Sequence, residues 1–303
     1  MERLSRTVVV IVLVVASAFI IARPHSHSTA AARPSPTPGA TVSTDPSSTP
    51  GSVPAVVRPG RLLRPALSRY LGAQPGTITA AVVDTATGQS FVYRPGVRSI
   101  TASIMKVDIL ETLLSRAQAE DRDLTEDERE LSRRMIEESD NDAAEDLWEL
   151  LGGAPAVAQY NARAGLENTV PNQAGYWGLS TTSALDQVRL IKQICYPSNL
   201  FTRSSRRYAL DLMTHVDPAQ AWGVSAGVAR KATVALKNGW LPHDGAWQVN
   251  SIGCVRGDGR NYVIAVLVGG TSSESGNIRT IEGLSKRVWT QLRPSTSHPH
   301  GPR

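Results

Sequence analysis

Residues 233–268, TVALKNGWLPHDGAWQVNSIGCVRGDGRNYVIAVLV, decide the fold because they hold three successive β-rich segments. The segments are Thr233–Lys237, Ala246–Val255 and Asn261–Val268, each short and rich in β-branched residues. A group of strands this short is not expected to be stable as a separate sheet. The late strands therefore need further strands elsewhere in the chain and a covering layer of helices.

Those further strands lie near residue 80. Ile78–Asp84 reads as a strand, Thr85–Gly88 as a turn, and Gln89–Arg94 alternates like a returning strand. Pairing this group with the late triplet gives one antiparallel sheet, with terminal helices, including Ile278–Leu292, on a face.

The middle of the chain is helical, and we expect it to form a second lobe. Its helices are predicted at Ile104–Ala119, Asp127–Glu138, Ala143–Leu151, Pro155–Ala164, Ser183–Ile194 and Ser204–Val216. The predicted fold is therefore α/β of the α+β type: an antiparallel sheet flanked by terminal helices, plus an all-helical lobe. A cleft between two such lobes is a natural site.

The first 60 residues are not expected to belong to this core. Arg3 and Arg6 precede an apolar run, 8–22, which predicts a signal peptide or a signal anchor over residues 1–23. No cysteine follows the run, so attachment of a lipid there is excluded. Residues 24–60 read as a disordered linker rich in Pro, Ser and Thr, and 293–303 as a disordered tail. The folded domain is then 61–292, and we expect it outside the cytoplasm, secreted or anchored at the cell surface.

Charge and cysteine content limit the partners. Residues 61–303 hold 27 basic and 25 acidic residues without a long basic run, which excludes a nucleic-acid-binding class. A membrane is expected to meet the protein only through the N-terminal segment, and the domain is expected to be a monomer. Cys195 and Cys254 allow one disulfide, but two separate buried thiols are an equal alternative. We find no metal site and no cofactor motif.

A Ser-x-x-Lys pair marks the predicted start of the first long helix. Ser103 and Lys106 are three residues apart, which places the hydroxyl and the amine on one helix face. Serine becomes nucleophilic only when a neighbouring base takes its proton, and a lysine with a lowered pKa is such a base. The alternative is that Ser103 merely caps the helix.

Two further short motifs follow. Ser139-Asp140-Asn141 lies between two predicted helices, where it could offer a proton relay and an amide, or simply cap the helix before Ala143. Lys237-Asn238-Gly239 ends a late strand, where a second cation could lower the pKa of Lys106, although Asn-Gly is also a hairpin-turn signal.

In combination, the order Ser-x-x-Lys, Ser-Asp-Asn, Lys-x-Gly over most of residues 70–292 resembles the serine β-lactamases and penicillin-binding proteins, closest to the class A β-lactamase type. The resemblance implies that Ser103 is the nucleophile, Lys106 its base, and Ser139 a relay to the leaving nitrogen. It further implies that Lys237 supports the electrostatic field. The backbone N–H groups of Ser103 and Trp240 would form an oxyanion hole. Substrate contacts are expected from Asn141, Asn238, Gly239 and Trp240.

Two departures from that family bear on function. Asn238 stands where the family usually has Thr or Ser, which puts recognition of ordinary β-lactams in doubt. The loop 165–182 looks shortened, and its single acid, Glu167, falls too early to activate the deacylating water. Acylation with slow hydrolysis is therefore expected.

The predicted function is an exported serine hydrolase that cleaves an amide, a β-lactam or related, through an acyl-Ser103 intermediate. The alternatives are a D,D-peptidase acting on peptidoglycan stem peptides and an inactive cell-surface binding protein of the same fold. Gly223-Val-Ser225-Ala-Gly227 matches a nucleophile elbow of another hydrolase class, but it lacks a preceding strand, and we interpret it as a glycine-rich connection.

Overall fold

The computed structural model describes residues 64–292, so the predicted signal segment, the linker and the tail at 293–303 lie outside the described residues. The described part contains one five-stranded antiparallel sheet in the order β2-β1-β7-β6-β5. Its strands are β1 (Thr77–Asp84), β2 (Ser90–Tyr93), β5 (Thr233–His243), β6 (Ala246–Gly257) and β7 (Arg260–Thr271). The early pair and the late triplet therefore join in one sheet, and the fold-class prediction is confirmed.

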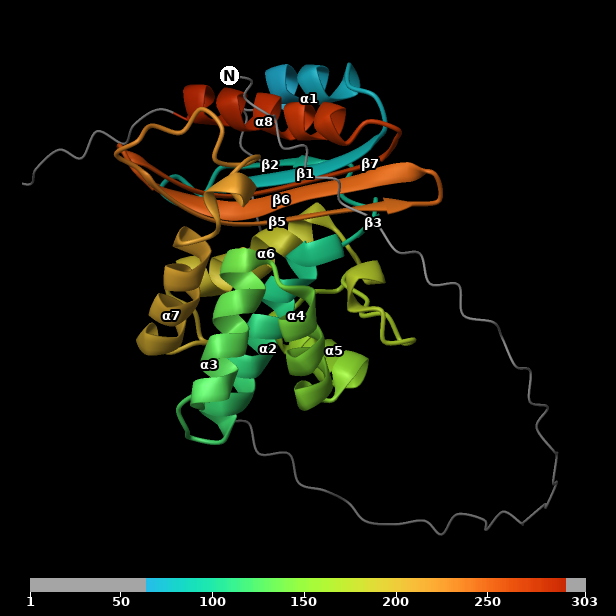
Figure 1. The fold of residues 1–303 in the computed structure, drawn as a ribbon. Coiled ribbons are helices and arrows are strands. Elements are labelled where there is room, and N and C mark those ends of the chain that lie inside the picture. Colours follow the sequence, from blue (N-terminus) through green and yellow to red (C-terminus); the bar gives the residue numbers. More distant parts are fainter. Residues whose placement is uncertain (1–63, 293–303) are drawn as a thin grey trace, which may run out of the picture. The chain divides into compact units, whose positions relative to one another are not determined.

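Helices cover both faces of this sheet, as Figure 1 shows. One face carries α1 (Arg64–Gly72) and α8 (Glu274–Gln291), which pack on each other. The other carries the helical lobe, formed by α2 (Met105–Ala119), α3 (Glu126–Arg133), α4 (Asn141–Leu151), α5 (Gly153–Ala164), α6 (Ala184–Cys195) and α7 (Arg203–Thr214). A two-stranded ladder, β3 (Ser99–Ile100) with β4 (Thr181–Thr182), leads into the lobe.

The sheet is buried on both sides, so its strands contribute side chains to two hydrophobic cores. Along β7, Val263 and Ala265 belong to the core on the helical-lobe side, whereas Ile264 and Val266 belong to the core under α1 and α8. This is the two-residue alternation of a strand applied to two apolar layers.

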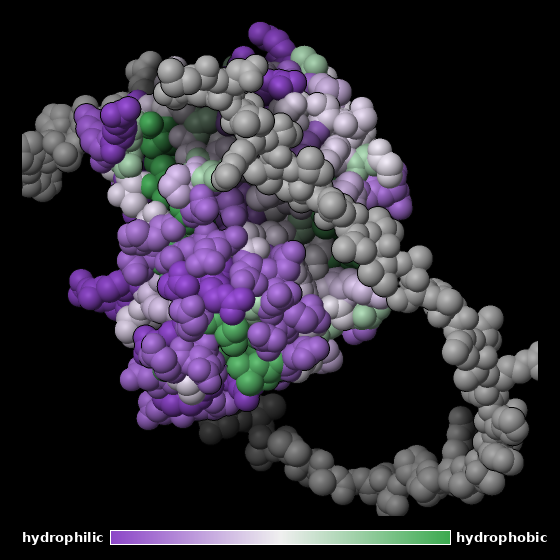
Figure 2. All heavy atoms as spheres, viewed as in Figure 1, coloured by the Kyte–Doolittle hydropathy of each residue, from purple (hydrophilic) through white to green (hydrophobic). Residues whose placement is uncertain are grey.

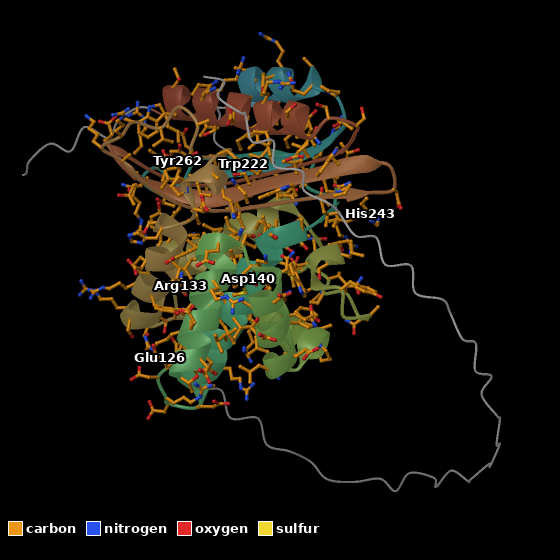
Figure 3. The ribbon with its side chains drawn as sticks, in the orientation of Figure 1. Glu126, Arg133, Asp140, Trp222, His243 and Tyr262 are labelled. Carbon is orange, nitrogen blue, oxygen red and sulfur yellow. A yellow bond between two sulfur atoms is a disulfide. The ribbon has the colours of Figure 1, made fainter. Side chains whose placement is uncertain are left out.

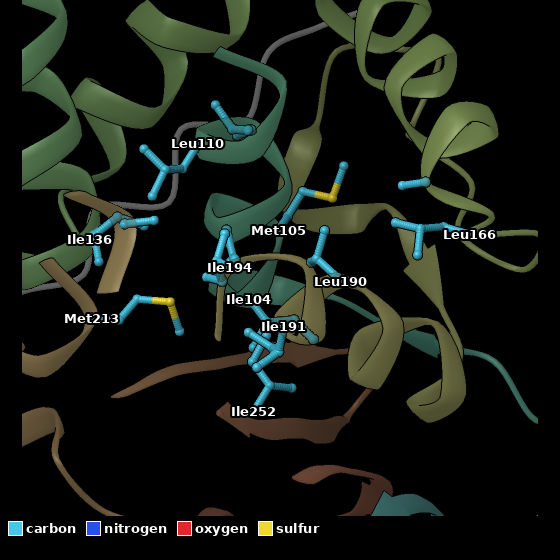
Figure 4. Packing of buried hydrophobic residues seen from close by; sticks show 14 of the residues in the cluster. Ile104, Met105, Leu110, Ile136, Leu166, Leu190, Ile191, Ile194, Met213 and Ile252 are labelled. Carbon is cyan, nitrogen blue, oxygen red and sulfur yellow. The ribbon is translucent and has the colours of Figure 1, made fainter. Parts of the chain in front are cut away.

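Helix α2 runs through the middle of the helical lobe and is buried on nearly all sides. Its apolar residues pack with those of α6 and the sheet around Ile104, Leu110, Ile191 and Ile252 (Figure 4). A helix enclosed in this way is held by packing along its whole length. Residues at its start are consequently fixed relative to the sheet.

Cys195, at the end of α6, and Cys254, in β6, form a disulfide with a Cα–Cα distance of 6.5 Å. Of the two alternatives left open by the sequence, the structure shows the paired one. The bond ties the helical lobe to the central sheet across 59 residues of chain.

The surface of the described part is mixed. On the face seen in Figure 2, hydrophilic residues cover most of the helical lobe, with a small hydrophobic group among them. None of the helices in residues 64–292 is long and apolar enough to cross a bilayer.

Candidate active site

Ser103 lies in a single 3-10 turn, Ala102–Ile104, immediately before α2. No side chain caps this turn or the start of α2, so the alternative that Ser103 is only a helix cap is wrong. Its hydroxyl makes no hydrogen bond within residues 64–292 and lines a pocket of about 240 Å³. The preceding Ala102 has a φ of 48°, a left-handed conformation that is rare and costly for a residue with a side chain.

The side chains of the Ser139-Asp140-Asn141 loop have two different roles: Asp140 caps a helix, and Ser139 and Asn141 face Lys106. Asp140 caps α4, because its Oδ1 accepts a 3.0 Å hydrogen bond from the Ala143 N–H, and its other oxygen pairs with Arg134. Ser139 has a φ of 57°, and it follows a π-helical turn, Arg134–Glu138, of a kind common at functional sites. The cap reading therefore holds for Asp140 alone. Figure 3 shows Asp140 at the end of the helical lobe nearest the sheet, with Glu126 at the far end.

Lys106 connects the first two motifs. Its Nζ donates to the Ser139 carbonyl at 2.6 Å, to Ser139 Oγ at 3.1 Å and to Asn141 Oδ1 at 2.8 Å. The indole ring of Trp177 lies 5.1 Å from the same nitrogen. Burial lowers the pKa of Lys106 to about 7, although the negative charge of Asp140 opposes that shift. At neutral pH a large share of this amine is therefore uncharged and able to accept a proton.

Lys237 brings in the third motif from β5. Its Nζ donates to Ser139 Oγ at 2.9 Å and to the Asn238 carbonyl at 3.0 Å, and its side chain is 1% exposed. Burial, together with the charge of Lys106, holds the pKa of Lys237 well below its usual value. Ser139 Oγ thus lies between two lysine nitrogens, forming a continuous chain from Lys106 to Lys237.

Gly239 continues β5 past the Ser103 turn. A Cβ at Gly239 would lie 2.6 Å from both the Ser103 and the Ile104 backbone nitrogens. The Asn-Gly pair is therefore not the hairpin turn that its sequence suggests. The strand continues to His243, and the turn is made by Asp244 and Gly245, both at positive φ.

A substrate contact from Asn238 stays a prediction, and the structure shows this side chain in a structural role. The side chain is 1% exposed, and its Nδ2 donates to the Gln220 carbonyl at 2.6 Å and the Trp222 carbonyl at 3.1 Å. This amide therefore ties the 220–222 segment to β5. Trp222 in turn packs edge-on against Trp240, with ring centroids 5.6 Å apart.

The pocket wall includes residues that the sequence did not single out. Gln220 and Glu138 line it beside the predicted Ser103, Ser139, Asn141 and Trp240. Glu138 is paired with Arg133, whose Nη1 donates to its Oε1 at 2.7 Å. Asn250, on β6, donates to the Ile100 and Thr101 carbonyls at 2.9 Å each and so holds the segment that leads to Ser103.

The loop 165–182 supplies no carboxylate to this pocket. Glu167 is exposed, and the pocket is lined instead by the residues named above. The loop contributes Trp177, whose Nε1 donates to Glu145 Oε2 at 2.8 Å while its ring covers Lys106. No acid from this loop is therefore placed to activate a water molecule at an acyl-Ser103.

Comparisons with known proteins identify the family. Residues 127–292 match the family described as "Beta-lactamase enzyme family". The chain belongs to this family.

Particular relatives and structures are similar over most of the described part. "Putative lipoprotein LppW" of Mycobacterium tuberculosis and of Mycobacterium bovis is 30% identical over 203 residues, which are 64% of this chain and 63% of that protein. The chain thus spans about 63% of the length of these curated relatives. The TLA-1 extended-spectrum β-lactamase superposes with a TM-score of 0.68 at 18% identity, covering 76% of this chain and 98% of its own. PBP-A superposes with a TM-score of 0.67 at 25% identity, covering 78% and 98%.

Proposed function

We propose that this protein is an exported serine acyl-enzyme that opens an amide, in a β-lactam or a related compound, through an ester on Ser103, and that it deacylates slowly. The observation that carries the proposal is the Lys106–Ser139–Lys237 chain beside an unbonded Ser103 hydroxyl. A pure binding protein has no evident need for two buried lysines that share one hydroxyl, since burying each charge costs free energy.

Acylation begins with proton removal from Ser103. As an ammonium, Lys106 uses three N–H groups on its three acceptors at Ser139 and Asn141. Loss of one proton leaves a lone pair on Nζ, and Ser103, three residues earlier in the chain, is the proposed proton donor to it. The Ser103 oxygen then forms a bond to the amide carbon as its proton passes to Lys106.

The carbonyl oxygen becomes negatively charged in that step. Its proposed donors are the backbone N–H groups of Ser103 and Trp240. β5 is an edge strand, and alternate residues of such a strand direct their backbone groups away from the neighbouring strand. The Asn238 carbonyl accepts from the Lys237 side chain, so the N–H of Trp240, two residues on, faces the same side.

Collapse of the intermediate breaks the carbon–nitrogen bond. The leaving nitrogen takes a proton from the Ser139 hydroxyl, and Lys106 donates to Ser139 the proton that it received from Ser103. The acyl group stays on Ser103. Asn141 and Trp240 are the proposed contacts for the rest of the substrate, and both line the pocket. Water must then release the acyl group, and slow release is supported because the loop 165–182 supplies no carboxylate to the described pocket lining.

A second candidate is a D,D-peptidase that uses the same steps on peptidoglycan stem peptides. The buried Asn238 favours it over an efficient β-lactamase, because no hydroxyl at that position faces a β-lactam carboxylate. PBP-A, the structure similar at 25% identity, has been solved in a variant form as an acyl-enzyme complex with penicillin G. That protein's behaviour supports a test with penicillins here.

Export is proposed on two grounds. The Cys195–Cys254 disulfide is typical of proteins in oxidising compartments. The mycobacterial relatives carry a lipoprotein name.

The test is intact mass of the purified protein over time with a panel of penicillins, beside the Ser103→Ala variant. A mass gain equal to the drug in the wild type alone supports the proposal. A long-lived adduct favours the peptidase, and rapid loss with accumulating product favours a β-lactamase. Equal adducts in both proteins, or none with any donor, including a D-Ala-D-Ala peptide, would leave the inactive binding protein as the better account.

A further inference from the structure

Four arginines converge on a second pocket, away from the site of Ser103. Its volume is about 470 Å³, and its charged lining comprises Arg203, Arg206 and Arg207 of α7, Arg256 of β6 and one acid, Asp211. We call it the arginine pocket. Its floor includes Cys195 and therefore the disulfide.

These guanidinium groups are not neutralised by the protein. Within residues 64–292, none of the four makes an ion pair with a carboxylate, whereas Arg122, Arg133 and Arg189 elsewhere each do. Asp211 lies 3.5 Å from His215 and, among the described residues, forms no ion pair with an arginine. The lining is thus strongly positive, and the four like charges repel one another.

The position of three of the arginines adds to this positive field. Arg203, Arg206 and Arg207 lie in the first five residues of α7, whose first turn has no acid. A helix N-terminus carries a partial positive charge, so basic residues there are unfavourable and an anion there is favourable.

Two buried polar atoms mark the edge of the pocket. Arg256 Nε and the Tyr196 hydroxyl are both buried, and neither has a hydrogen-bond partner within the described residues. The guanidinium of Arg256 stacks 4.7 Å from the centre of the Tyr196 ring, which fixes its plane. Arg256 and Pro197 also line an adjoining pocket of about 410 Å³, so the two hollows meet at Arg256.

We propose that the arginine pocket binds a phosphate-bearing anion. Guanidinium groups fit phosphate oxygens in pairs, and several converging arginines are typical of phosphate recognition. The volume is that of a small-molecule site and exceeds what a single carboxylate side chain fills. Inorganic pyrophosphate and a phosphate ester in a lipid headgroup share the required chemistry.

The site is separate from the proposed catalytic pocket. Arg256 pairs in register with Thr233, which is four residues, or about 13 Å, before Lys237 along β5. Among the described residues, none lines both pockets. Binding at the arginine pocket therefore does not depend on acylation of Ser103, and the two proposals fail independently.

The test compares two double variants of the full chain. Arg206→Gln with Arg256→Gln removes two charges from the pocket, and Arg69→Gln with Arg230→Gln removes two exposed charges elsewhere as the matched control. Calorimetric titration with inorganic pyrophosphate is expected to be saturable, weaker at higher salt, and at least tenfold weaker in the pocket variant only. Should that variant fail to fold, Arg203→Gln with Arg207→Gln, at two exposed positions, replaces it.

A second arm separates the sources of phosphate. Flotation with phosphatidylglycerol vesicles, against phosphatidylcholine vesicles, is run on the same variants. Pocket-dependent binding of pyrophosphate assigns a soluble phosphate compound, and pocket-dependent binding of phosphatidylglycerol alone assigns a headgroup. If neither probe distinguishes the pocket variant from the control, the arginine pocket is not a phosphate site.

Discussion

Gly239 and Ser103 lie backbone to backbone, so that a β-carbon on Gly239 would be 2.6 Å from the Ser103 nitrogen. This contact places the outer strand of the sheet directly against the turn that carries the proposed nucleophile. The residue after Gly239 is Trp240, the second proposed donor of the oxyanion hole. The proposed oxyanion hole therefore depends on the absence of a side chain at one position.

Gly239→Ala is expected to move the Ser103 turn or β5, because the added carbon would clash with backbone atoms of Ser103 and Ile104. Since displacements of about 1 Å at a reacting group cost roughly 10² in rate, acylation should fall at least a hundredfold. Stopped-flow kinetics with a chromogenic β-lactam measures this acylation rate. The control is Gly96→Ala, at an exposed glycine where an added Cβ would have no neighbouring atom within 4 Å, and it should keep the wild-type rate.

Acylation should depend on the protonation of Lys106. Its pKa is lowered to about 7, and only the uncharged amine accepts a proton. The rate constant should rise about tenfold per pH unit below neutrality and level off above it. Asp140→Asn keeps the α4 cap, since Asn caps as well as Asp, but removes the negative charge that raises the pKa of Lys106. Its midpoint should move to lower pH; a midpoint that stays or moves upward would contradict the assignment.

The disulfide should contribute strongly to stability. It closes a loop of 59 residues, for which the chain-entropy model gives about 4 kcal/mol. Cys195→Ser with Cys254→Ser should lower the free energy of unfolding in urea by an amount of this order. Wild type treated with a reductant is the companion measurement, and an unchanged unfolding midpoint in both would show that the bond is absent in solution.

A buried acid should make stability fall with rising pH. Asp108 is fully buried in α2, and burial raises its pKa from 3.8 to about 8, although Asn161, with its amide turned to donate, opposes the shift. Between these values the folded state holds a proton that the unfolded state lacks. The contribution is therefore complete at low pH and is lost as pH approaches 8, with a slope of about 1.4 kcal/mol per pH unit.

Asp108→Asn should flatten that slope, measured by urea unfolding at pH 5, 6, 7 and 8. The variant keeps the contribution of Glu111, whose raised pKa acts with the same sign, and those of Lys106 and Lys237, whose lowered pKa values act with the opposite sign. The difference between the two slopes therefore reports Asp108. Glu149→Gln, at an exposed position, should leave the pH dependence unchanged. Parallel curves for wild type and Asp108→Asn would show that Asp108 does not titrate in this range.

The sheet was predictable because its strands are rich in β-branched residues. They fall in two groups, each too short to form a stable sheet without the other. The bounds of helix α1 were not predicted, since its buried residues, Leu67 and Leu71, are too few to show a helical period. Its partner is distant in sequence: Tyr70 donates to the Thr280 carbonyl of α8 at 3.1 Å. The extension of β5 through Asn238-Gly239 was also missed, because contact with the Ser103 turn overrides a local turn preference.

Of the candidate site, the sequence indicated the residues that carry short motifs. The hydrogen bonds join Lys106, Ser139, Asn141 and Lys237 as one network, with Ser103 on the adjoining pocket. No short motif marks Gln220, Trp177 or Asn250. Each lies in a segment that is distant from the motifs in sequence and comes close to the site only when the chain is folded. The roles of the network in catalysis remain predictions.

The most direct test of the account is to locate the acyl group. The protein is treated with a penicillin, digested, and its peptides are sequenced by mass spectrometry. We predict that the mass of the drug is found on Ser103 and on no other residue. An adduct on Ser139 or Ser225 instead, with Ser103 unmodified, would contradict the central claim that Ser103 is the nucleophile.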